Sequence, residues 1–276
     1  MGSYIPAAPA EQREMLEAIG LRDFRELYRD VPESMYLDRP LDIPAGMSEL
    51  EVGRALQAMA AKNQVFSTIL RGAGAYDHYI PSIVKYIPAK EEFLTAYTPY
   101  QAEMSQGLLQ SIFEYQTMIC QLTGMDVSNA SVYDGATAAA EAVTMMYGLR
   151  PRDKQKSGAN VVFVDENIFP QTLAVMNTRA IPQGIELRVG RYQEFEPTQE
   201  VFACILQYPN SDGSIENYRS FTEKAHEADC KVAVAADLLS LALIVPPGEW
   251  GADIVFGTTQ RSTGRMEFSG IMTHKS

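Results

Sequence analysis

The sequence has few cysteines and few basic residues, and both shortages narrow what the protein can be. Its three cysteines, Cys120, Cys204 and Cys230, lie far apart among 276 residues, so neither a disulfide framework nor a paired-cysteine zinc ribbon is indicated. Reduced, mostly buried thiols are expected instead. With 23 basic against 35 acidic side chains the net charge is −12, and no lysine or arginine cluster offers the basic surface of a nucleic-acid or anionic-membrane binder.

Neither a membrane span nor a secretion signal is expected from the sequence. Residues 1–20 carry acids and glutamine where a signal peptide needs a basic end followed by an apolar run. The most apolar stretch, residues 232–245, is split by Asp237 and is too short to cross a bilayer. We therefore expect a soluble protein of the cytoplasm or an organelle matrix, with the cytoplasm as the first choice, and neither membrane nor nucleic acid as a partner.

Apolar residues at helical spacing dominate the first half of the chain. A stop at Gly20 interrupts the first such stretch. Ser48 and Glu51, three residues apart, form the pattern of a capping box at the start of a helix. Later, apolar residues between Leu108 and Cys120 repeat on one helical face. The pattern predicts helices near residues 15–28, 48–63, 104–122 and 137–149.

From Asn160 onward short β-branched runs alternate with helical segments, whereas residues 262–276 show no clear periodicity. This alternation is typical of a mostly parallel sheet with helices on both faces, a fold that binds ligands at the carboxyl ends of its strands. The expected division is an N-terminal helical extension, residues 1–46, and an α/β domain, residues 47–276. Strands are expected at residues 161–164, 185–189, 203–207, 232–236 and 254–256, with helices at 169–178 and 218–228.

Two aromatic loops are candidate binding segments. The loop of residues 72–88 contains two glycines, which let the backbone approach a ligand, and aromatic and imidazole groups that combine flat surface with hydrogen bonding. A second segment precedes a helix start, where polar groups can meet a small ligand. Packing of these side chains under their loops is an equally good interpretation, and no metal-ligand spacing accompanies the histidine. The candidates are Tyr76, His78, Tyr79, Tyr97, Tyr100 and Gln101.

A third segment, residues 128–137, combines small residues with a helix start. Such residues let backbone amides face a phosphate, and Ser131 and Tyr133 are candidates for contacting a ligand there. Asp134 opposes this interpretation, because its carboxylate would repel a phosphate at the same amides. We therefore expect Asp134 to act as an N-cap.

The last candidate is Asp237, directly after the predicted strand 232–236. An acid at that position can hold the protonated ring nitrogen of a cofactor. Gln260 follows the next predicted strand, and no lysine occurs between Lys231 and Lys275. No residue of this chain is predicted to be catalytic or to bind a metal.

Four motifs follow one another in a fixed order along the chain: IPSIV at 80–84, TAYTPYQAEMSQG at 95–107, NASVYDGATA at 129–138 and PPGEWGADIV at 246–255. Together they resemble the glycine decarboxylase P-protein of the glycine cleavage system. More narrowly, they resemble its subunit 1, the amino-terminal half in organisms that divide the enzyme between two chains. The similarity covers about residues 1–260.

The resemblance implies a fold-type-I pyridoxal phosphate transferase fold and a partner chain of the same fold, subunit 2. It also implies a reaction in which glycine loses CO2 and its aminomethyl group passes to lipoylated H-protein. In the family, subunit 2 carries the cofactor's lysine, whereas Gln260 stands at the corresponding position here and an amide cannot form a Schiff base. We therefore expect pyridoxal phosphate on the partner, not covalently on this chain, and no activity without the partner. The two aromatic loops become candidates for reaching into the partner's pocket, and Asp237 becomes a retained scaffold acid.

The resemblance ends after Gln260. Family members continue with a proline- and glycine-rich loop and a C-terminal domain, whereas this sequence reads RSTGRMEF and stops at Ser276, so a truncated chain without the usual small domain is expected. Two alternatives stay open. One is an independent pyridoxal phosphate enzyme using Lys275, and the other is a non-catalytic or defunct truncated paralogue that acts as a scaffold or interaction module.

Overall fold

The computed structural model describes residues 7–70, 79–94, 98–263 and 270–274. The chain divides into two compact units, Met1–Gly74 and Ala75–Ser276. The sequence predicts a boundary at residue 46, whereas the first unit extends to Gly74.

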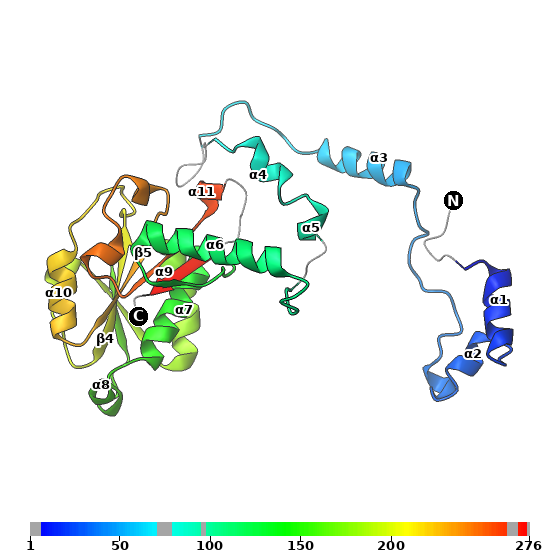
Figure 1. Ribbon diagram of the computed structural model, residues 1–276, viewed down its shortest axis with the longest axis horizontal. Coiled ribbons are helices and arrows are strands. Elements are labelled where there is room, and N and C mark those ends of the chain that lie inside the picture. Colours follow the sequence, from blue (N-terminus) through cyan, green and yellow to red (C-terminus); the bar gives the residue numbers. More distant parts are fainter. Residues whose placement is uncertain (1–6, 71–78, 95–97, 264–269, 275–276) are drawn as a thin grey trace. The chain divides into compact units, whose positions relative to one another are not determined.

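The first unit consists of short helices with almost no core. Its elements are α1 (Pro9–Ala18), α2 (Phe24–Leu27), the 3-10 turn η1 (Glu33–Met35) and α3 (Glu49–Ala60) (Figure 1). Gly20, at a φ of +76°, follows the end of α1 and confirms the predicted stop. Among the described residues of this unit only Leu16 is buried. Hydrophobic burial within the unit is therefore too small to hold these helices together.

The start of α3 confirms the predicted capping box. The hydroxyl of Ser48 accepts a hydrogen bond from the backbone N–H of Glu51 at 3.3 Å, and the backbone N–H of Ser48 donates to the Glu51 carboxylate at 2.7 Å. Hydrogen bonds from Ser48 lower the pKa of Glu51. The helix begins where the pattern predicts and ends three residues earlier, at Ala60.

The second unit is built on a seven-stranded sheet in the order β1-β7-β6-β5-β4-β2-β3. Strands β2 to β6 run parallel, and β7 runs antiparallel to both β6 and β1. The five predicted strands are confirmed, and β7 lies in the segment where the sequence showed no periodicity. The bounds are β1 (Val127–Ser128), β2 (Val161–Asp165), β3 (Glu186–Gly190), β4 (Val201–Tyr208), β5 (Lys231–Ala236), β6 (Ile254–Thr258) and β7 (Gly270–His274).

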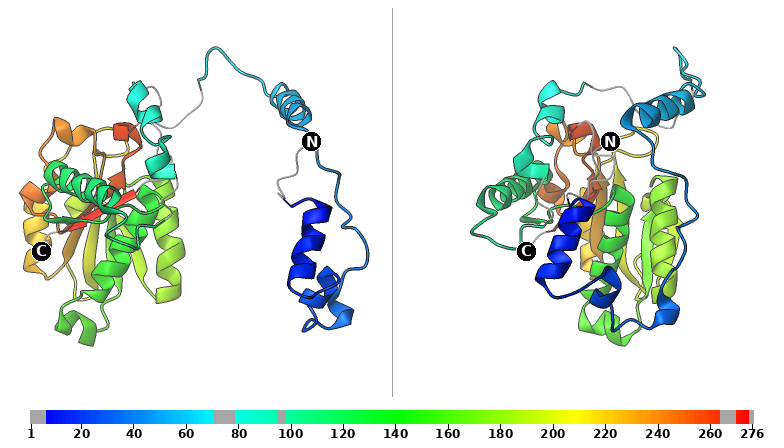
Figure 2. Two further views of the ribbon diagram at one scale, coloured as in Figure 1. Left: turned by 45° about the vertical axis from the view of Figure 1, so that its right-hand side comes forward. Right: turned by 90° about the vertical axis from the view of Figure 1, so that its right-hand side faces the viewer.

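Helices cover both faces of this sheet, as expected. Buried residues of α7 and α9 pack on one face, and residues of α6, α10 and the 3-10 turn η5 pack on the other. The right-hand view of Figure 2 shows the strands between these two layers. The helices are α4 (Ser82–Tyr86), α5 (Glu91–Leu94), α6 (Gln106–Thr123), α7 (Gly135–Gly148), α8 (Arg152–Lys156), α9 (Pro170–Ala180), α10 (Arg219–Glu227) and α11 (Gln260–Thr263), and η5 spans Pro247–Trp250.

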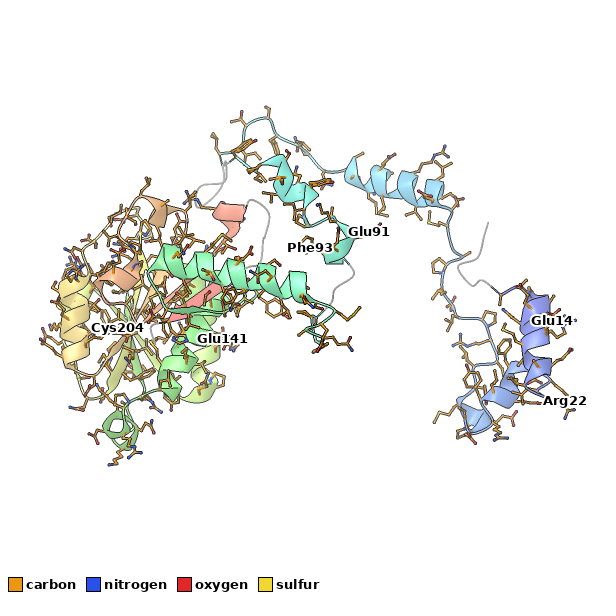
Figure 3. All side chains as sticks on the ribbon, in the orientation of Figure 1. Glu14, Arg22, Glu91, Phe93, Glu141 and Cys204 are labelled. Atoms are coloured by element: carbon orange, nitrogen blue, oxygen red, sulfur yellow. The ribbon has the colours of Figure 1, made fainter. Side chains whose placement is uncertain are left out.

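The thiols are mostly buried, as expected. Cys204 and Cys230 are buried and Cys120 is partly buried, and none of the three forms a disulfide; Figure 3 labels Cys204 within the sheet. Burial raises the pKa of Cys204 well above its ordinary value. The buried ammonium of Lys154 donates to the carbonyl of Val201 at 2.6 Å and lies 3.7 Å from the Cys230 sulfur. This contact ties α8 to the start of β4.

The apolar face predicted for α6 is only partly covered within the second unit. Ile119 is buried, but Leu108 and Ile112 are partly exposed and Phe113 is 64% exposed. Helix α6 meets the sheet at β1 and β7, so the cover is concentrated at the C-terminal half of the helix. In the described part of the chain, no helix has the length and apolar character needed to cross a membrane.

The backbone comes unusually close to itself where β5 and β6 end and α7 begins. A Cβ added at Gly257 would lie 2.1 Å from the carbonyl oxygen of Ala236, and one added at Gly135 would lie 3.1 Å from the carbonyl carbon of Gly257. Only glycine permits this approach. The two strand ends and the helix start therefore form one tightly packed edge.

Replacing Gly257 by alanine should destabilise the second unit by about 2 kcal/mol or more, because the added Cβ meets rigid backbone. Gly148→Ala is the matched control, since a Cβ there meets no atom within 4 Å, and it should be neutral or slightly stabilising. Urea unfolding compares the two variants. Equal unfolding midpoints would contradict the close approach.

Asp253, just before β6, joins three elements at the opposite edge of the sheet. Its carboxylate accepts hydrogen bonds from the Lys231 ammonium at 2.7 Å and the Val232 N–H at 2.8 Å, and lies 2.7 Å from the His226 ring nitrogen. Burial raises the pKa of Asp253, but the hydrogen bonds from Lys231, Val232 and His226 outweigh it and leave the pKa below its ordinary value.

Asp253→Asn should therefore lower the thermal stability of the protein at neutral pH and change it little in acid. Because the folded-state pKa is lowered, the contribution of the ionised carboxylate is complete above the ordinary value of 3.8 and is lost as pH falls through the lower folded value. Thermal melting of both proteins from about pH 7 down to about pH 3 should show the difference shrinking. Asp153→Asn, whose side chain is 98% exposed, should show no such trend.

Candidate functional site

The candidate site is the tightly packed edge formed by the ends of β5 and β6 and the start of α7, which we call the edge site. It contains Asp134, the N-cap of α7, together with Asp237 after β5 and Gln260 and Arg261 after β6. The carboxyl ends of neighbouring parallel strands meet at such an edge, and ligands of α/β sheets collect there.

Asp134 occupies the start of α7 as an N-cap. Its carboxylate accepts a hydrogen bond from the backbone N–H of Thr137 at 2.7 Å. The amides that a phosphate-binding loop would offer therefore already face a negative side chain. This confirms the N-cap expectation. Ser131 and Tyr133, in the preceding loop, are both exposed, Tyr133 by 81%.

Asp237 is held by an arginine that the sequence analysis did not identify. One carboxylate oxygen lies 2.7 Å from the Arg261 guanidinium, and the other accepts from the backbone N–H of Leu239 at 3.3 Å. Asp237 is 22% exposed and Arg261 is 41% exposed, so the carboxylate is more shielded from water than the guanidinium. A signal was present, because Arg261 is the first basic residue after Lys231.

Gln260 begins α11, two residues beyond the end of β6. Its backbone N–H donates to the Thr258 hydroxyl at 3.2 Å, and its side chain is exposed. The position that follows β6 therefore presents an amide and no amine. Lys275, the alternative Schiff-base residue, lies outside the described residues.

A buried polar group behind the edge site was also missed by sequence reasoning. The Tyr218 hydroxyl donates to the Asn210 side-chain oxygen at 2.8 Å, and burial raises the pKa of Tyr218. Gln207, 3% exposed, donates to the carbonyl of Ala235, while its side-chain oxygen has no partner within the described structure. These residues join the ends of β4 and β5.

The structure does not gather the remaining candidates into the edge site. Tyr79 precedes α4 and Tyr100 precedes α6, and each is 86% exposed. Gln101 is also exposed. Tyr76, His78 and Tyr97 lie outside the described residues. No cluster of three or more histidine, cysteine, aspartate or glutamate side chains suited to a metal occurs in the parts of the chain that the structure describes.

The sequence profile of the family described as "Glycine cleavage system P-protein" matches residues 2–272. The chain belongs to this family. It is 57% identical over 258 residues to a glycine dehydrogenase (decarboxylating) of Bacteroides thetaiotaomicron, covering 93% of this chain and 27% of that protein. It is 44% identical to a probable glycine dehydrogenase (decarboxylating) subunit 1 of Carboxydothermus hydrogenoformans, covering 97% of this chain and 61% of that protein. The resemblance inferred from the four motifs is thus confirmed.

The fold is confirmed by a solved relative. The crystal structure of glycine decarboxylase (P-protein) of the glycine cleavage system, in inhibitor-bound form, superposes with a TM-score of 0.82 at 36% identity and covers 100% of this chain and 63% of that chain. This is the expected α/β fold of type-I pyridoxal phosphate enzymes. The chain spans about a quarter of the length of the Bacteroides relative and about three fifths of the subunit 1 relative.

The family depends on pyridoxal phosphate, but the edge site does not fit that cofactor. A type-I site needs a lysine amine, an acid free to hold the ring nitrogen and helix amides free to hold the phosphate. Here Gln260 supplies an amide, Asp237 is paired with Arg261, and Asp134 occupies the start of α7. No reaction step is therefore assigned to this edge.

Asp134→Ala should lower the stability of the second unit by about 1 kcal/mol, because it removes the side-chain cap of α7. Asp134→Ser should stay close to the wild type, since serine is a comparable N-cap. Urea unfolding of the three proteins tests this. An alanine variant as stable as the serine variant would show that the cap contributes nothing.

Proposed function

We propose that this chain forms the amino-terminal, subunit-1-type part of a glycine decarboxylase and is inactive without a lysine-bearing partner chain. The partner part carries pyridoxal phosphate, glycine loses CO2 there, and the aminomethyl group passes to lipoylated H-protein. The observation that carries this proposal is Gln260 after β6, in a chain of this family whose edge site holds no amine. The expected place of the assembly is the cytoplasm.

The uncovered face of α6 supports the need for a partner. Leu108 and Ile112 are partly exposed and Phe113 is 64% exposed on a helix whose apolar residues recur at core spacing. Apolar surface of this kind is typical of an interface that a second chain covers. We assign this face to the partner chain of the same fold, so the isolated protein should self-associate.

The exposed aromatic segments are the groups this chain offers to the partner's pocket. Tyr100 and Gln101 lie just before α6, an 18-residue helix whose positive end favours a carboxylate or phosphate nearby. Their neutral hydroxyl and amide groups can donate to such an anion without adding charge. Tyr97, Tyr76, His78 and Tyr79 belong to the same proposal, with Ser131 and Tyr133 as further candidates.

The test is glycine-dependent CO2 exchange by the complete protein that contains this sequence, assembled with its partner and lipoylated H-protein. Tyr100→Phe and Gln101→Ala should each reduce exchange on the order of 10-fold while folding and assembly are unchanged, as expected when a charge-stabilising hydrogen bond is lost. Gln199→Ala, an exposed glutamine before β4 at the opposite edge of the sheet, is the control.

Full exchange by both variants would exclude a site role for this segment. A complete assembly with no exchange at all would instead support the scaffold interpretation. Borohydride reduction with pyridoxal phosphate, followed by peptide mapping, should label no lysine of this chain. Stoichiometric labelling at Lys275 would favour an independent enzyme.

A further inference from the structure

The edge site is filled by charges of the chain itself. The Arg261 guanidinium forms an ion pair with the carboxylate of Asp237. The Asp134 carboxylate accepts a hydrogen bond from the backbone N–H of Thr137 at the start of α7. The first is a cation placed where the type-I fold places a ring N–H, and the second is an anion placed where it places a phosphate. Both charges have the sign of the cofactor group whose position they take.

We propose that Arg261 and Asp134 form an internal lock that excludes pyridoxal phosphate from this chain independently of the missing lysine. This rests on the proposed function, in which the partner alone carries the cofactor. The lock is thus a specificity device, because it keeps the cofactor on one half of an assembly built from two similar folds.

The arginine half of the lock is a charge-assisted ion pair that a cofactor would have to displace. The 2.7 Å contact joins Asp237, whose side chain is 22% exposed, to Arg261, whose side chain is 41% exposed. A cofactor ring nitrogen would have to break this bond before it could use Asp237.

The aspartate half acts on the phosphate. A doubly charged phosphate at the start of α7 would meet the Asp134 carboxylate on the same backbone amides, and like charges at that separation repel strongly. The close approach of Gly135 to Gly257 and Thr258 leaves the helix start no room to shift toward the strand end and make space for a phosphate.

Arg261 directly follows Gln260 in α11, so restoring an amine at position 260 leaves the lock in place. The Gln260→Lys variant should therefore gain little affinity for pyridoxal phosphate. Adding Arg261→Met and Asp134→Ser removes both charges, and serine preserves the helix cap. This triple variant should bind the cofactor at least about 10-fold more tightly than Gln260→Lys.

The experiment measures the half-saturating concentration of pyridoxal phosphate by absorbance and the borohydride-fixed label on the peptide that contains position 260. The matched control combines Gln260→Lys with Asp153→Ser and Arg152→Met, which makes the same charge changes on α8. Thermal melting identifies any variant that fails to fold. Each lock substitution is also added singly to Gln260→Lys, so that one unfolded variant does not end the comparison.

The lock is excluded if Gln260→Lys and the unlocked variants have the same half-saturating concentration of pyridoxal phosphate. It is also excluded if folded unlocked variants bind the cofactor no more tightly than the control variant. These outcomes are independent of CO2 exchange. If the unlocked variants bind while Tyr100→Phe and Gln101→Ala keep full exchange, the lock stands and the proposed site role fails. If the unlocked variants bind no more tightly than Gln260→Lys while Tyr100→Phe and Gln101→Ala lose exchange, the lock is excluded and the proposed site role stands.

Discussion

The structure depends on the burial of strand β4 at the centre of the parallel sheet. Every residue from Val201 to Tyr208 is buried, and from Ala203 to Leu206 the side chains alternate between the two helix layers. Such a strand cannot shift its register by one residue without exchanging its two faces. Strands β2 and β5 pair with β4 on either side, so their ends, and with them Asp237 and the edge site, are positioned by this one buried strand.

Much of the α/β unit could be predicted from the sequence because its signals are local. The β-branched runs of β2 and β5, the capping box at Ser48 and the cap at Asp134 each depend on residues within a few positions of one another. Strand β7 could not be predicted, because it pairs with β6 and β1 and shows no apolar pattern of its own. The pairing of Asp237 with Arg261 was missed for a similar reason, since it joins residues 24 positions apart through the turn after β6.

The aromatic site candidates show that composition alone does not predict a pocket. Aromatic residues near a helix start suggested a pocket, but Tyr79 and Tyr100 are almost fully exposed. Their value to a site depends on a surface that another chain supplies, and one sequence does not specify that surface. The sequence did predict that apolar residues recur on one face of α6. The incomplete cover of this face could not be foreseen, because periodicity identifies the buried face of a helix but not which chain buries it.

The near absence of a core in the first unit has a thermodynamic consequence. Isolated helices as short as the 10 residues of α1 and the 12 of α3 are marginal in water, and only Leu16 is buried among the unit's described residues. Within the unit alone, their opening free energy is therefore close to zero, and stable helices need a further apolar surface to pack on. Part of the free energy gained by any such contact is consumed in ordering the helices, so the contact is weaker than its area alone indicates.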